Sequence, residues 1–291
     1  MPFLILAKRP TPVTLQQFDS PMDKENSRPW VAPKYEGQDN ALGWTPEAFG
    51  IPEGMEQRVS FWLDIYTKYN SHQGLLHDSR HVHLVYEALD FTYIDGDSEK
   101  TLAQKRHARR DLVKNAKRKI KERLLKLQKL YSAHVKNQEA TALEQIKAAG
   151  VVLDQEDERY LHMFERVDEK NKFKVASRRG RLRFQLGQKD HFVKGIYYSG
   201  RYIDEMEIIF KEYGLPIELT RLPFVESSFN LKARSKVGAS GIWQFMRSTG
   251  RMYMKIDAVV DERNEPLKAT ESAAKMLRSN YNMLGTWPLA V

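Results

Sequence analysis

The sequence predicts a mainly α-helical protein with a small α+β segment near its N-terminus. From residue 98 onward, apolar residues recur at steps of three and four, as they do in amphipathic helices. Between residues 75 and 91, the short run Leu75–His77 and a second run rich in β-branched and aromatic residues flank a polar turn, as in a hairpin. The 291 residues can bury one large core or two smaller ones. The absence of cysteine excludes disulfides, thiolate metal sites and a thiol nucleophile.

Residues 1–45 hold six of the twelve prolines and predict an extended or disordered leader. Its apolar cluster, Phe3 to Ala7, is too short for a signal peptide and is followed, not preceded, by basic residues. No apolar run approaches the roughly 20 residues that cross a bilayer. The chain is therefore either cytoplasmic or lacks its export signal.

Residues 46–97 are expected to form the small α+β segment. Helical spacing predicts a short amphipathic helix through Val59, Trp62, Leu63, Tyr66 and Tyr69. A hairpin follows, with Leu75–His77 as its first strand, a turn at 78–80, and a second strand within 81–91.

Residues 98–205 are expected to be helical and to begin with one long helix that Ser98 caps. The core face of this helix follows steps of 4, 4, 4, 3 and 4 through Leu112, Ala116, Ile120, Leu124, Leu127 and Tyr131. Further helices are predicted at about 140–149, 155–167, 188–199 and 202–213. Gly214 ends the last of them, and Pro216 stands where another helix would start.

The outer face of the long helix makes the protein basic. Between Lys105 and Lys129 there are twelve basic and two acidic residues, so this segment exceeds the net charge of +9 of the whole chain. A solvated helix face is the simplest interpretation, and attraction to an anionic wall or membrane surface is the alternative. Nucleic-acid binding is the weakest candidate, because no nucleic-acid-binding motif is present and Tyr131 is the only aromatic ring nearby.

Three histidines, His77, His81 and His83, lie within seven residues, and on a strand the last two would point to the same side. Neutral imidazole is a common metal ligand. No carboxylate or fourth ligand follows at a recognisable spacing, so a solvated strand face is the expectation and no metal or cofactor is predicted.

The segment 215–250 carries the chemistry. Glu226 ends the apolar run Leu222–Val225, and desolvation there would raise the pKa of its carboxyl, as a general acid requires. Gly238 and Gly241 permit a tight turn before Trp243 and Gln244, and an aromatic ring beside an amide suits a sugar ring. A buried structural Glu, paired with an arginine such as Arg221 or Arg234, is the competing interpretation.

The stretches ELTRLPFVESSFN, SKVGASGIWQF, DERNEPLKATESAAKML and GTWPLAV resemble the catalytic domain of lytic murein transglycosylases of the soluble type, nearest the membrane-bound lytic transglycosylase D group. The resemblance covers residues 206–291, and a weaker one extends upstream. It implies a lysozyme-like α domain with Glu226 as the single catalytic acid and base. It also implies that substrate is contacted by or near Ser227, Ser235, Gly238, Gly241, Gln244, Phe245 and Met246.

The implied reaction cleaves the bond between N-acetylmuramic acid and N-acetylglucosamine in peptidoglycan without water and leaves 1,6-anhydro ends. The pair of carboxylates that most glycosidases use is missing from the motif, and Asp257, Asp261 and Glu262 follow about thirty residues later. A lysozyme-type hydrolase is the rival enzyme, and a non-catalytic wall-binding or scaffold protein is the rival from another class.

The resemblance also implies a periplasmic or outer-membrane-associated protein with glycan strands as its partner. The family's next motif, Ala-Tyr-Asn-x-Gly, is absent after Trp287–Val291. The catalytic domain is therefore expected to be incomplete at its C-terminus, and residues 1–291 alone to be weakly active or inactive.

Overall fold

The computed structural model describes residues 49–136 and 140–291. The predicted leader and its Phe3–Ala7 cluster lie outside the described residues. Contacts divide the chain into two compact units, a first unit from residue 53 to 198 and a second unit that contains residues 199–291. Among the helices of the described residues, none combines the length and the hydropathy needed to span a membrane.

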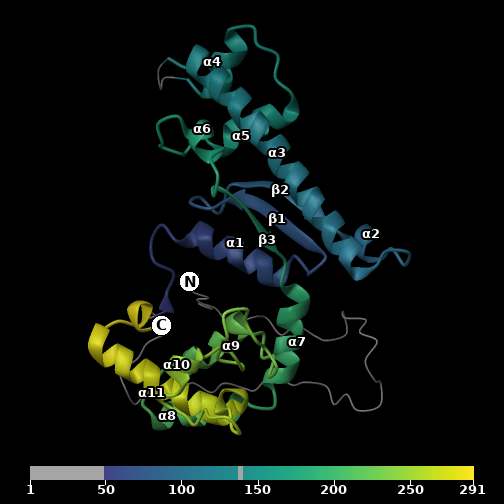
Figure 1. Cartoon of the computed structure of the whole chain (residues 1–291). Coiled ribbons are helices and arrows are strands. Elements are labelled where there is room, and N and C mark those ends of the chain that lie inside the picture. The colour runs from purple at the N-terminus through teal and green to yellow at the C-terminus, as the bar shows by residue number, and fades with distance from the viewer. Residues whose placement is uncertain (1–48, 137–139) are drawn as a thin grey trace. The chain divides into compact units, whose positions relative to one another are not determined.

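The first unit contains seven helices, counting α7, and three strands within the described residues (Figure 1). In chain order they are α1 (Glu56–Thr67), β1 (Gln73–Asp78), β2 (Val85–Asp90), α2 (Thr92–Asp95), α3 (Leu102–His134), α4 (Ala142–Ala148), α5 (Gln155–Met163), α6 (Lys172–Ala176), β3 (Leu182–Leu186) and α7 (Lys189–Ser199).

The strands form one antiparallel sheet in the order β2-β1-β3. The predicted hairpin is confirmed as β1 and β2, with Leu75 opposite Ala88. The expectation of helix alone after the hairpin is wrong at β3, which pairs with the other edge of β1 and sets Phe184 opposite Leu76. Five residues are too few to show the alternation of apolar and polar side chains that indicates a strand. β3 is a strand because it pairs with the free edge of β1, which is far away in sequence.

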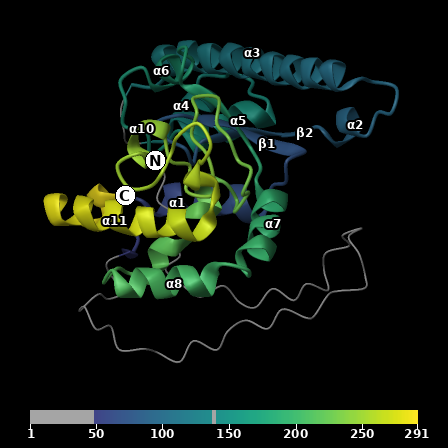
Figure 2. The same ribbon diagram turned by 60° about the horizontal axis from the view of Figure 1, so that its bottom comes forward.

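Adjacent residues of β1 serve two hydrophobic cores, because successive side chains of a strand point to opposite faces. Leu75 packs with Phe61 and Ile65 of α1. Leu76 belongs to the larger core, together with residues of α3, α5 and α6 such as Leu124 and Phe173. Helix α1 therefore covers one face of the sheet and α3 runs past the other, an arrangement that both views show (Figures 1 and 2).

The long amphipathic helix is confirmed as α3, and its expected core positions Ala116, Ile120, Leu124 and Leu127 are buried. The predicted cap was wrong by one turn. Thr101, not Ser98, caps the helix, because its side chain accepts from the N–H of Gln104 while the Gln104 side chain accepts from the N–H of Thr101. A capping box satisfies two helix-end donors at once, which a lone serine does not.

The second unit is built from short helices around one longer one. Its elements are α8 (Ile203–Glu212), η3 (Ile217–Arg221), α9 (Leu222–Glu226), α10 (Arg247–Gly250), η4 (Glu262–Asn264), α11 (Pro266–Leu284) and α12 (Trp287–Ala290). Helices α8 and α11 lie side by side (Figure 2). The indole of Trp243 stacks on Phe210 of α8 at 5.7 Å and donates from Nε1 to Thr270 of α11 at 2.9 Å.

The expected fold class, mainly α with a small hairpin-containing segment, is thus confirmed. The helices predicted after α3 appear as α4, α5, α7 and α8, each within a few residues of its expected bounds. Gly214 follows the last of them with φ 66°, and Pro216 directly precedes η3.

Candidate active site

Glu226 is the last residue of α9, a short helix that begins directly after η3 and has Pro223 in its first turn. Phe224 and Pro223 of this helix are buried, whereas Glu226 is exposed at the surface. Its carboxylate forms no hydrogen bond or ion pair with any residue in the described part of the chain, so the pairing with Arg221 or Arg234 that the competing interpretation requires is not formed. Arg221 pairs with Glu207 instead, at 2.6 Å.

Although the Glu226 side chain reaches solvent, the protein around the carboxyl group removes enough water to raise its pKa above the usual value of 4.5. The carboxyl thus combines access for a substrate with a bias toward the protonated form, which is the state that donates a proton.

The residues after Glu226 reverse the chain. Ser228 and Phe229 both adopt left-handed backbone angles, with φ of 51° and 53°. The turn places the Phe229 ring, 1% exposed, edge-on against Phe224 at 4.6 Å. Burial of this aromatic pair offsets the strain of two consecutive left-handed residues and fixes the end of α9 that carries Glu226.

Ser227 connects α9 to a loop fifteen residues later. Its hydroxyl lies 2.9 Å from the carbonyl oxygen of Ile242 and 3.2 Å from that of Pro223. The loop 235–245 therefore lies beside the C-terminal end of α9. The predicted site residues Glu226, Ser227 and those of the loop belong to one local structure.

The loop itself is closed at Ser235. The N–H of Ser235 donates to the carbonyl of Ala239, and the N–H of Ala239 donates back to the Ser235 hydroxyl oxygen, both at 2.9 Å. Gly238, with φ 95°, makes the turn between them. Because the Ser235 oxygen accepts from the backbone, its hydroxyl proton remains to be donated to another group.

Gly241 is required by packing as well as by its φ of 76°. A Cβ at this position would lie 1.7 Å from the carbonyl oxygen of Arg263. At Gly238, by contrast, a Cβ would meet nothing within 4 Å. The two glycines of the motif thus have different roles, since one permits a turn and the other also permits close approach of two backbone segments.

Gln244 has an unusual φ of 49°, and its amide is fixed on the donor side. Nε2 lies 2.7 Å from the carbonyl oxygen of Gly241 and 3.3 Å from that of Ala233. Both amide hydrogens are thereby used, which leaves Oε1 to accept. Of the next two predicted residues, Phe245 is buried at 4% exposure, whereas Met246 is 40% exposed and offers an apolar surface to solvent.

Arg263, which the sequence did not single out, holds the loop in place. Its guanidinium is 5% exposed, donates to the carbonyls of Gly238 (2.8 Å) and Phe245 (3.0 Å), and forms a two-pronged pair with Asp261 (2.8 and 2.7 Å). The bond with Asp261 raises the pKa of Arg263 and lowers that of Asp261. The string DERN shows an arginine among acidic neighbours, which can pair with it bidentately, but it does not show that Arg263 is the residue that becomes buried.

The acidic residues after the motif are occupied by local structure. Asp257 accepts from the N–H groups of Val259 and Val260, and Glu262 accepts from the N–H of Lys255. Glu218 of η3 is a second acidic residue that lacks a partner, because its buried Oε2 forms no hydrogen bond with any of the described residues. Burial raises the pKa of Glu218, as it does for Glu226.

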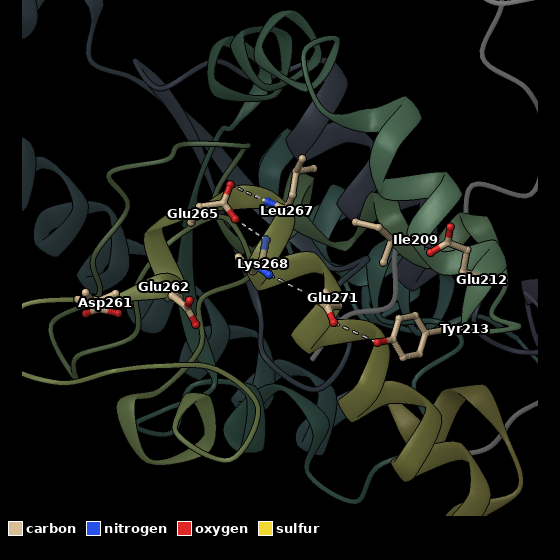
Figure 3. A pocket seen from close by; sticks show the side chains of 10 residues that line it. Ile209, Glu212, Tyr213, Asp261, Glu262, Glu265, Leu267, Lys268 and Glu271 are labelled. Carbon is tan, nitrogen blue, oxygen red and sulfur yellow. Dashed lines mark hydrogen bonds and ion pairs between the residues drawn. The ribbon is translucent and has the colours of Figure 1, made fainter.

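A pocket of about 750 Å³ in the second unit is lined by α8, η4 and α11 (Figure 3). None of the predicted site residues lines it. Two of its acidic side chains serve the fold: Glu265 accepts from the first N–H groups of α11, and Glu271 binds Lys275 and the hydroxyl of Tyr213. The pocket is therefore not the place where Glu226 would act.

The histidine cluster differs from the expected strand face. His81 and His83 lie in the turn before β2, with ring centroids 6.0 Å apart, and His77 is buried in β1. β1 ends at Asp78, whose carboxylate accepts from the N–H groups of Arg80 and His81, and β2 begins only at Val85, so His81 and His83 belong to the turn. Across the described ranges, no three His, Cys, Asp or Glu side chains are arranged to hold a metal ion.

The second unit is similar in sequence to known proteins. Residues 208–291 match the family model described as "Transglycosylase SLT domain". Over 83 residues, the chain is 41% identical to the "Membrane-bound lytic murein transglycosylase D" of Escherichia coli K12, and equally to that of Escherichia coli O6:H1. The aligned region covers 28% of this chain and 18% of each relative, so the chain spans less than a fifth of their length. Residues 208–291 are therefore similar to a transglycosylase SLT domain, and in this structure they are mainly α-helical.

Proposed function

We propose that the protein is a peptidoglycan lytic transglycosylase, in which Glu226 is the single acid and base. The observation that carries this proposal is the state of Glu226 in its SLT domain. The carboxyl group is accessible, unpaired within the described residues and biased toward protonation, and Ser227 ties it to the loop of Ser235 and Gln244. The match to the SLT family supports the reaction class.

The proposed reaction breaks the β-1,4 bond between N-acetylmuramic acid and N-acetylglucosamine. Protonated Glu226 donates its proton to the linking oxygen as the C1–O bond breaks, and the substrate's N-acetyl group stabilises the cation at C1. The resulting carboxylate then removes the proton from the C6 hydroxyl while that oxygen bonds to C1. Glu226 is protonated again at the end, the product is a 1,6-anhydro sugar, and no water is consumed.

Ser235 and Gln244 would position the sugar on either side of the cleaved bond. Backbone contacts leave Ser235 with a donor and Gln244 with an acceptor, a complementary pair for the hydroxyl and acetamido groups of a saccharide. Exposed Met246 would supply apolar surface for the sugar ring, and buried Phe245 would support the loop from behind. Gly238, Gly241 and Ser227 would set the shape of this site and not contact the reacting atoms.

The acidic residues that follow the motif support a mechanism with one acid. A retaining or inverting glycosidase needs a second carboxylate that is free to act as nucleophile or base. Asp257, Asp261 and Glu262 accept hydrogen bonds from backbone or Arg263, and the pKa values of Asp257 and Asp261 are lowered. Their engagement in the fold favours the transglycosylase over the lysozyme-type hydrolase.

A protein with this activity would act where peptidoglycan is, in the periplasm or at the outer membrane. The printed name of the Escherichia coli relatives, a membrane-bound murein transglycosylase, supports this location. Fractionation of cells that produce the tagged full-length protein tests it, and recovery in the cytoplasmic fraction would contradict it.

Product analysis tests the function. Purified sacculi digested by the full-length protein should release muropeptides that end in 1,6-anhydro-N-acetylmuramic acid, 18 mass units lighter (about one water) than the hydrolytic product. Reducing ends would instead identify a lysozyme-type hydrolase. Binding to sacculi without release of either product would identify a wall-binding or scaffold protein.

A further inference from the structure

Two groups of basic residues on α3 differ in their contacts. The first group is paired inside the first unit. Arg109 binds Asp95, and Arg123 and Lys126 bind Asp157, whose side chain is fully buried. These pairs hold α3 against α2 and α5 and so serve the fold.

The second group, which we name the basic stripe, comprises Arg110, Lys114, Lys117 and Lys121 of α3 together with Arg183 of β3. The steps of four, three and four place the helix residues on one face, over a length of about 16 Å at 1.5 Å per residue. Arg183 lies close enough for its charge, after burial, to lower the pKa of Lys117. None of the five side chains forms an ion pair or hydrogen bond with a residue in 49–136 or 140–291.

This arrangement leaves positive charge uncompensated at a fixed place on the surface. His77 faces Arg183 across the strand pair, and both Lys117 and Arg183 help to lower its pKa, after the larger effect of burial. Lys117 and Arg183 therefore lie close enough to repel each other, and no carboxylate acts on Lys117. An anionic partner along the stripe would relieve this repulsion.

The apolar face of α3 argues against a membrane as that partner. Ala116, Ile120 and Leu124 are buried in the core of the first unit, so α3 has no free apolar face to insert between lipids. Nucleic acid is disfavoured because single strands are bound by aromatic stacking. The one ring on α3, Tyr131, packs on Phe173 and faces the Lys172 ammonium.

We propose that the basic stripe binds the carboxylates of murein peptide stems, at a site of the first unit that is additional to Glu226 in the second. Murein is chosen as the anionic polymer because it is the substrate in the proposed function, on which this inference rests. The free carboxyl groups of peptide stems recur along a glycan strand and make it a polyanion, and a straight row of lysines and arginines complements such a chain.

Binding to sacculi tests the stripe without catalysis. The full-length protein would carry Glu226→Gln, so that the polymer stays intact, and its affinity would be measured by co-sedimentation. We expect Lys114→Gln/Lys121→Gln to weaken binding about thirtyfold, on the scale of about 1 kcal/mol for each basic residue at an anionic surface. The matched control is Lys119→Gln/Lys129→Gln, which removes the same charge from exposed positions of the same helix outside the stripe. Equal binding by both variants, or equal weakening, would overturn the proposal.

The chemistry of the partner is tested in parallel. Amidation of the carboxyl groups of the sacculi should abolish the difference between the two variants, and about 200 mM salt should reduce it. Tighter, stripe-dependent binding to anionic phospholipid vesicles or to DNA would overturn the assignment to murein. Stripe-dependent binding to sacculi by a protein that releases no anhydro product would instead refute the proposed catalysis and leave this inference standing.

Discussion

The hydroxyl of Ser227 donates to the carbonyl of Ile242 across 2.9 Å and so joins the helix of Glu226 to the loop of Gln244. The two segments are fifteen residues apart in sequence, and each contains part of the proposed site. A side chain next to the acid thereby controls the position of the groups that would hold the sugar.

Ser227→Ala should loosen this connection. We expect a loss of about 1 kcal/mol of folding free energy from the missing hydrogen bond and a decrease of about tenfold in kcat on sacculi. Ser228→Ala is the control, because the Ser228 hydroxyl lies at a long 3.4 Å from the carbonyl of Phe224. If both variants behaved alike in denaturation and turnover, Ser227 would not have the role described.

Gly241→Ala and Gly238→Ala form a second pair. Both introduce a Cβ at positive φ, which costs about 1–2 kcal/mol, but only the Cβ at Gly241 would collide with the Arg263 carbonyl. We expect Gly238→Ala to lower the free energy of unfolding by about that amount and Gly241→Ala by more than about 3 kcal/mol. Urea denaturation measures both, and equal losses would contradict the packing argument.

Arg263→Lys should preserve the charge beside Asp261 but not the fork of hydrogen bonds to Gly238 and Phe245. A buried carbonyl left without a donor lowers the free energy of unfolding by about 1–3 kcal/mol. Arg247→Lys is the control, because Arg247 is exposed and makes one contact with a carbonyl, that of Asp257. A larger effect at Arg247 than at Arg263 would be evidence against the clamp.

The raised pKa of Glu226 has a definite sign in a pH profile. The protonated carboxyl is the proposed donor, so kcat/KM should fall as pH rises through the folded pKa, which lies above 4.5. Since the folded state binds this proton more tightly than the unfolded state, the associated stability is present below 4.5 and is lost as pH rises through the folded pKa.

The variant Glu218→Gln separates the effect of Glu218 on the pH dependence of stability from the effect of Glu226 on the pH dependence of kcat/KM. The pKa of Glu218 is also raised by burial, so its replacement should remove part of the loss of stability with pH. The alkaline decrease in kcat/KM should remain, because that decrease belongs to Glu226. If kcat/KM of Glu218→Gln no longer fell with rising pH, the decrease would belong to Glu218 and not to Glu226.

The parts of the fold that sequence could predict depend on local pattern. The steps through Ala116, Ile120 and Leu124 repeat often enough to predict α3, and the turn around Asp78 predicts the hairpin. Strand β3 could not be predicted, because its pairing with β1 depends on contacts about a hundred residues apart.

The candidate site shows the same division. The apolar run before Glu226 predicts a carboxyl of raised pKa, in agreement with the structure. The clamp of Arg263 on Gly238 and Phe245, and the burial of Phe245 itself, arise when distant segments fold together. No local pattern states which of several charged residues in DERN will be buried.

The most direct measurement of the central claim is the rate at which the full-length protein and its Glu226→Gln variant release 1,6-anhydro ends from sacculi, followed by mass spectrometry. A glutamine of the same shape can neither donate nor accept the proton, so we expect a decrease of about 10²- to 10⁴-fold, while Glu218→Gln retains most of the rate. Release of anhydro ends by Glu226→Gln at a rate near that of the unchanged protein would contradict the assignment of Glu226 as the single acid and base.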